Sequence, residues 1–70
     1  MVGEYKFSKT DSIFVNVNEM VSMRIEGATG TVYINFKSSY QEVVFCQGEY
    51  LDTFVALLSR DWMTSKYKEI

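Results

Sequence analysis

The 70-residue sequence contains no histidine and a single cysteine, Cys46. Histidine is the side chain most used for general acid–base catalysis and for metal ligation near neutral pH. With no histidine and only one thiol, a zinc site lacks its usual ligands. A lone cysteine cannot form an intrachain disulfide and is typically a buried apolar residue. We therefore expect no metal, no cofactor and no enzymatic activity, and a reducing, cytoplasmic setting.

Positive charge and long apolar runs are also scarce. Seven Lys and Arg residues face nine Asp and Glu residues, which gives a net charge of −2. A duplex-DNA binder needs several cations on one face, so this balance disfavours one. No stretch has the length of a membrane span or the pattern of a signal peptide, so we expect no membrane association. Seventy residues support one small core, and 47% apolar residues exclude intrinsic disorder.

Two segments alternate apolar and polar residues with the period of a half-buried strand. They are residues 20–26 and 31–37, and the loop between them contains Gly27 and Gly30. This arrangement predicts a β-hairpin. The inward-facing residues are then Val21, Met23 and Ile25 on the first strand and Val32, Ile34 and Phe36 on the second.

Three other segments have strand character. Residues 4–8 alternate around Tyr5 and Phe7, and we expect a short edge strand there, followed by a loop, within residues 1–12. Residues 13–17 are β-branched and aromatic, as strands prefer. Residues 42–46 are continuously apolar after Glu42, which favours a central strand or one covered on both faces. Residues 13–47 are thus expected to form antiparallel strands.

After Gly48 the apolar period changes from two residues to about 3.6. The stripe consists of Leu51, Phe54, Val55, Leu58 and Trp62. This spacing predicts a helix over residues 49–63, followed by a polar tail over 64–70. The fold class is therefore α+β: a single domain, residues 1–70, in which a small antiparallel sheet of three to four strands precedes one C-terminal helix packed on one face.

The outward face of the predicted hairpin carries the most distinctive polar group, Arg24, Tyr33, Asn35 and Lys37. Cations beside an aromatic ring can hold single-stranded nucleic acid, whereas the same residues also occur as ordinary cross-strand pairs on a solvated sheet. Phe14, Trp62 and one of Val43 and Val44 are expected to remain as an apolar remainder on the second sheet face, and Phe14 and Trp62 are the candidate interface residues. We expect a non-enzymatic interaction module that contacts another protein or a second copy of itself as a homodimer. The alternative is a small regulator that binds single-stranded nucleic acid through the exposed sheet face.

Overall fold

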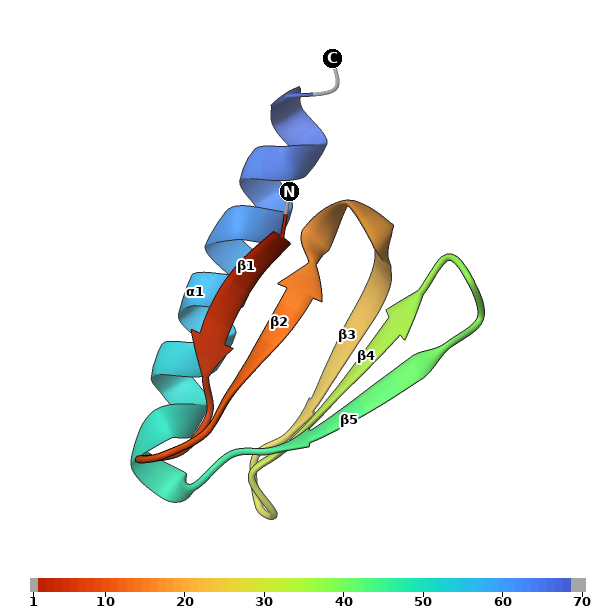
Figure 1. The fold of residues 1–70 in the computed structure, drawn as a ribbon. Helices are drawn as coiled ribbons and strands as arrows, with labels where there is room; N and C mark the ends of the chain where they lie inside the picture. Colours follow the sequence, from red (N-terminus) through yellow and green to blue (C-terminus); the bar gives the residue numbers. More distant parts are fainter. Residues whose placement is uncertain (1, 69–70) are drawn as a thin grey trace.

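The computed structural model describes residues 2–68, with side chains up to residue 67. It has five strands, one 3-10 turn and one long helix (Figure 1). In chain order these are β1 (Val2–Lys6), β2 (Ser12–Asn16), η1 (Val17–Glu19), β3 (Met20–Glu26), β4 (Thr31–Phe36), β5 (Gln41–Phe45) and α1 (Gly48–Lys68). The α+β class, the antiparallel strands and the C-terminal helix are confirmed.

The strands form two sheets rather than one. β1 pairs with β2, and β3, β4 and β5 form a second antiparallel sheet with β4 in the centre. The turn η1 separates them. The side-chain oxygen of Asn16 accepts a hydrogen bond from the backbone N–H of Asn18 at 3.2 Å, as a capping residue does. The chain therefore changes direction between β2 and β3, and these two strands do not pair.

The hairpin of β3 and β4 is confirmed, but one part of its predicted inward face is wrong. Met20 pairs with Phe36 and Ser22 pairs with Asn35, so Val21 is an extra residue in the ladder. Such a bulge shifts the alternation of side chains. Met20 is consequently buried, whereas Val21 is exposed. Ile25 is on the predicted inward face, opposite the buried Val32, but its side chain is exposed because it lies near the tip of the hairpin on an edge strand.

β5 is neither central nor covered on both faces, so that expectation is wrong as well. It lies at the edge of the three-stranded sheet. Val44 and the following Cys46 point into the core, but Val43 and Phe45 point outward and are exposed. The continuous apolar run is therefore an alternating strand whose outward residues are also apolar.

The core lies between the two sheets and the helix. Phe54 and Leu58 of α1 are completely buried, together with Val15 of β2 and Val32 and Ile34 of β4. The helix contacts β1 and η1 and lies behind β1 in Figure 1. Packing of one apolar helix stripe against both sheets explains how so short a chain forms a core.

One buried polar contact joins the first strand to the helix. The Tyr5 hydroxyl donates a hydrogen bond to Oδ2 of Asp61 at 2.5 Å, and the Tyr5 ring meets Phe54 edge-on at a centroid distance of 6.2 Å. Burial, and then this hydrogen bond, raise the pKa of Tyr5. The same hydrogen bond holds the pKa of Asp61 below its ordinary value.

The helix extends to Lys68, beyond the end predicted at residue 63, so residues 64–68 of the predicted polar tail are helical. Thr64 and Ser65 do not end the helix, because the Thr64 hydroxyl bonds within the helix and the Ser65 hydroxyl bonds to η1. Thr64 Oγ1 donates to the carbonyl oxygen of Arg60 at 2.8 Å, and Ser65 Oγ donates to Oδ1 of Asn18. Residues 69 and 70 of the predicted tail lie outside the described residues.

Candidate functional site

β1 pairs with one edge of β2, and the other edge of β2 has no paired strand in the described structure. The backbone N–H of Phe7 donates to the carbonyl oxygen of Asp11 at 3.2 Å, which makes these two residues a hydrogen-bonded pair. Hydrogen-bonded and non-bonded pairs alternate along an antiparallel ladder. Ser12 and Phe14 are opposite Lys6 and Glu4 in the intervening non-bonded positions. Their backbone N–H and C=O groups therefore point away from β1.

The outer edge of β5 is open in the same way. Phe36 N–H donates to the Tyr40 carbonyl at 3.1 Å, and Cys46 N–H donates to the Gly30 carbonyl at 2.7 Å. These bonds fix which residues of β5 bond to β4. By the same alternation, the backbone groups of Gln41, Val43 and Phe45 point away from β4.

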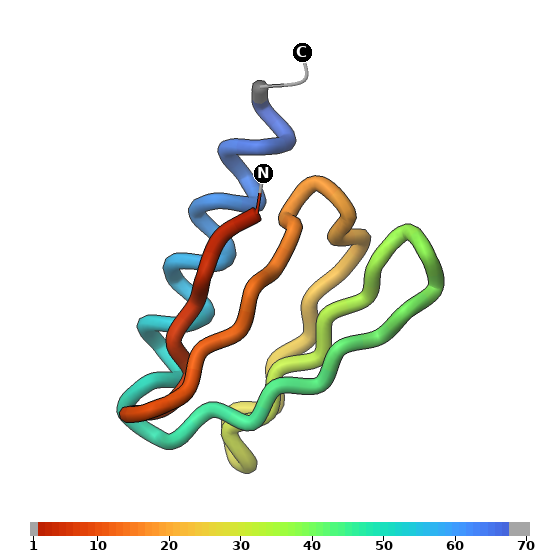
Figure 2. The backbone as a smooth tube through the Cα atoms, viewed as in Figure 1, coloured from red at the N-terminus to blue at the C-terminus, as the bar shows by residue number. Residues whose placement is uncertain are grey.

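These two open edges face each other. The backbone N–H of Gln47, just after β5, donates to the Phe7 carbonyl at 3.2 Å, which joins the end of β5 to the β1–β2 hairpin. From this point β2 and β5 run in opposite directions and separate (Figures 1 and 2). A pocket of about 230 Å³ lies between them, lined by Phe7, Ser12, Ile13 and residues 42–45. We call it the β2–β5 gap.

Exposed apolar side chains flank the gap on its outer side. Phe14 of β2 is 71% exposed, and Val43 and Phe45 of β5 are 52% and 68% exposed. Single exposed apolar residues are common on protein surfaces, but a group of them beside unpaired strand edges indicates an interaction surface. Phe14, Val43 and Phe45 together are called the apolar patch below.

Three of the four predicted polar residues share the outer face of the three-stranded sheet. Arg24 and Tyr33 are cross-strand partners, and the Arg24 guanidinium lies 4.1 Å from the centre of the Tyr33 ring. Arg24 also approaches Glu26 at 3.8 Å. Asn35, further along β4, donates a hydrogen bond to Ser22 Oγ at 3.0 Å. The cation and the ring are therefore already in contact with each other and with neighbouring side chains.

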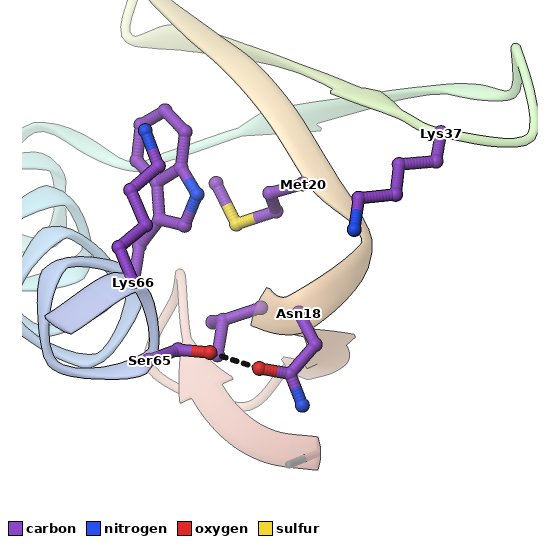
Figure 3. A pocket seen from close by; sticks show the side chains of 7 residues that line it. Asn18, Met20, Lys37, Ser65 and Lys66 are labelled. Atoms are coloured by element: carbon purple, nitrogen blue, oxygen red, sulfur yellow. Dashed lines mark hydrogen bonds between the residues drawn. The ribbon is translucent and has the colours of Figure 1, made fainter. Parts of the chain in front are cut away.

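Lys37 lies apart from those three residues. It follows the end of β4, and its backbone N–H donates to the Glu19 carbonyl at 2.8 Å. Its side chain lines a different pocket, of about 110 Å³, which also includes Trp62 and Lys66 of the helix (Figure 3). Lys66 Nζ lies 4.2 Å from the Trp62 ring centre. Trp62 is half-buried and packs against the core.

The apolar patch contains Phe14, which the sequence analysis selected, and Val43, one of the two valines between which it left the choice open. Phe45 was missed because its apolar run looks like a buried strand. The even spacing of Val43 and Phe45 around the inward Val44 was the available signal. Trp62, the other interface candidate, helps to close the core instead of adding to the patch.

Cys46 has a structural role, and the described chain contains neither a metal site nor a membrane-spanning helix. Cys46 is buried, and this burial raises the pKa of its thiol. Within residues 2–68 no three acidic, cysteine or histidine side chains come together as a metal site would require. No helix in the described part of the chain has the length and apolarity needed to cross a membrane.

Comparisons with models of protein families, with curated proteins and with solved structures find no significant match to this chain.

Proposed function

We propose that this chain is a small non-enzymatic interaction module that binds another protein through the apolar patch beside the β2–β5 gap. The observation that carries the proposal is the position of Phe14, Val43 and Phe45, which are exposed on two strands whose facing edges are unpaired. Burial of one phenylalanine side chain stabilises a complex by about 1.5–3 kcal/mol. Aromatic anchors of this kind dominate the binding energy of many interfaces.

Binding of a small molecule is a weaker explanation of the same surface. Ligand pockets usually enclose about 300–1,000 Å³. The β2–β5 gap, at about 230 Å³, is small for an enclosed ligand site, and it lies open beside the exposed apolar patch. The buried thiol of Cys46 and the Asp61 carboxylate, which is bonded to Tyr5, are parts of the folded core rather than exposed reactive groups. The unpaired thiol also suits a cytoplasmic setting.

Nucleic-acid binding through the exposed sheet face is the less favoured function. The Arg24 guanidinium covers one face of the Tyr33 ring and lies near the Glu26 carboxylate, so both groups would have to leave existing partners. Lys37 lies at a different pocket and does not add charge to this face. Protein contact requires no such rearrangement of the apolar patch.

Two kinds of partner fit the proposed function, a second copy of the chain as a homodimer or a different protein. Light scattering over a range of protein concentrations distinguishes a monomer from a homodimer. For a different protein, the chain is used as bait in an extract of its source cells. The captured protein is then purified and its affinity is measured directly.

The decisive comparison uses the double variant Phe14→Ser/Phe45→Ser and the matched control Leu57→Ser/Met63→Ser, which alters exposed apolar residues of the helix. We expect the patch variant to raise the dissociation constant of the purified complex by about tenfold or more, and the helix control to leave that constant unchanged. A captured pair or homodimer that is equally stable with the patch variant would contradict the proposal.

A further inference from the structure

The β2–β5 gap has main-chain hydrogen-bonding groups on both of its walls. Ser12 and Phe14 present theirs from β2, and Val43 and Phe45 present theirs from β5, as the register of both ladders shows. No other part of the described chain forms a hydrogen bond with these backbone groups. A segment in extended conformation carries matching N–H and C=O groups on both of its sides.

The edge of β5 carries little of the usual protection against added strands. Natural edges are blunted by charged residues, proline or a bulge. β5 has no proline and no bulge, Glu42 is its one charged residue, and its outward residues are Gln41, Val43 and Phe45. The bulge of this sheet lies instead on β3, the opposite edge. Of the two edges of the three-stranded sheet, β5 is therefore the one that remains suited to pairing.

We infer that the partner of the proposed interaction is a single extended segment of another protein, which enters the β2–β5 gap as an added strand. This inference rests on the proposed function and specifies its partner. Because β2 and β5 run in opposite directions, the segment is antiparallel to one of them and parallel to the other. It joins the two sheets into one continuous surface around the core.

A second copy of the chain does not fit the gap. In each copy the end of β5 is tied to the β1–β2 hairpin by the Gln47–Phe7 hydrogen bond, so β2 accompanies the open edge of β5. Two folded copies that brought their β5 edges together would place each copy's β2 in the space taken by the other copy's β5 and the β4 strand paired with it. A lone extended segment has no attached neighbouring strand and avoids this collision.

The lining of the gap specifies the side chains of the segment. Inward positions meet Phe7, Ile13 and Val44, so apolar residues are favoured at alternate positions. Glu42 is the one ionisable residue in the lining, and it also interacts with the Tyr40 hydroxyl. A lysine or arginine near the end that meets Glu42 complements its charge. The outward positions lie beside the apolar patch.

The test starts from a displayed library of random ten-residue peptides, which is selected on the full chain. Selected peptides are synthesised and their affinities are measured for the wild type, Val43→Pro and Val43→Thr. Val43→Pro removes an N–H that points into the gap and is not used by β4, whereas Val43→Thr keeps that N–H in a side chain of similar shape. Thermal unfolding of each variant verifies that it is folded.

We expect the selected peptides to alternate apolar and polar residues and to carry a basic residue. Val43→Pro should raise the dissociation constants of these peptides by about tenfold or more, and Val43→Thr should raise them much less. N-methylation of the peptide backbone gives a second test that leaves the protein unchanged. Because the segment bonds to β2 on one side and to β5 on the other, methylation of either alternate set of amides should abolish binding.

Four results would overturn the inference. The first is that no peptide is selected. The second is that selected peptides bind Val43→Pro as well as wild type but lose affinity for Phe14→Ser/Phe45→Ser, which leaves the proposed function standing without an added strand. The third is that only one alternate set of amides matters, since this indicates addition to a single edge. A homodimer in light scattering that protects the Val43 and Phe45 amides would likewise identify a second copy as the occupant.

Discussion

The backbone N–H of Gln47 donates a hydrogen bond to the carbonyl oxygen of Phe7 at 3.2 Å. This bond joins the end of the three-stranded sheet to the β1–β2 hairpin. Beyond it the facing edges of β2 and β5 separate and form the β2–β5 gap. The apolar patch lies along this opening, so the position of one backbone bond determines where the proposed partner binds.

Gly30 is required at the end of the β3–β4 loop. It has φ of +70°, and a Cβ atom there would lie 2.5 Å from the Cys46 carbonyl oxygen. Gly30→Ala should therefore lower the free energy of unfolding by about 1–3 kcal/mol, measured by urea denaturation. Gly27→Ala, in the same loop but with open space around it, is the matched control and should change stability far less. Equal effects of the two substitutions would show that the close approach to Cys46 is absent.

The hydrogen bond between Tyr5 and Asp61 contributes to stability. Tyr5→Phe removes the donor and leaves the half-buried carboxylate with Arg60, whose Nε lies at 3.1 Å. We expect a loss of about 1–2 kcal/mol in urea denaturation at neutral pH. Tyr33→Phe removes a hydroxyl that has no hydrogen bond in the described structure and should cost much less. A Tyr5→Phe variant as stable as wild type would contradict this role.

The contribution of Tyr5 should also depend on pH in the acidic range. The hydrogen bond from Tyr5 lowers the pKa of Asp61 in the folded state. A carboxyl group with a lowered folded pKa contributes stability above its unfolded pKa, about 3.9, and loses that contribution as the pH falls through the folded pKa. The stability difference between wild type and Tyr5→Phe should therefore be constant between about pH 5 and about pH 9, below the ordinary pKa of tyrosine, and should shrink below pH 5. A difference that grows on acidification would contradict the assignment.

The sequence predicts the elements of this fold better than their lateral arrangement. The alternation around Ile34 and the helical stripe around Phe54 correctly predict a hairpin and a helix, because each pattern reports which face of an element is buried. Alternation does not report which strand lies beside which. The division into two sheets depends on η1, and β5 is an edge strand because it pairs only with β4. Both are tertiary features, so the spacing of Val43 and Phe45 around Val44 indicates that they share a face but not that this face is exposed.

Single-stranded oligonucleotides should bind weakly or not at all. Arg24 already contacts Tyr33 and Glu26, and the chain has a net charge of −2. Titration of labelled oligonucleotides at low and moderate salt, followed by fluorescence anisotropy, checks this expectation. Binding that persists at moderate salt and is lost in both Arg24→Ala and Tyr33→Ala would establish the nucleic-acid function instead.

Amide hydrogen exchange along β5, followed residue by residue by NMR in the isolated chain, tests most directly whether this edge is open. The Glu42 and Val44 amides bond to β4 and should exchange slowly, whereas the Val43 and Phe45 amides point into the β2–β5 gap and should exchange much faster. This two-residue alternation is the predicted result. Uniform protection from Glu42 to Phe45 in the monomer would show that β2 and β5 pair directly and would contradict the account.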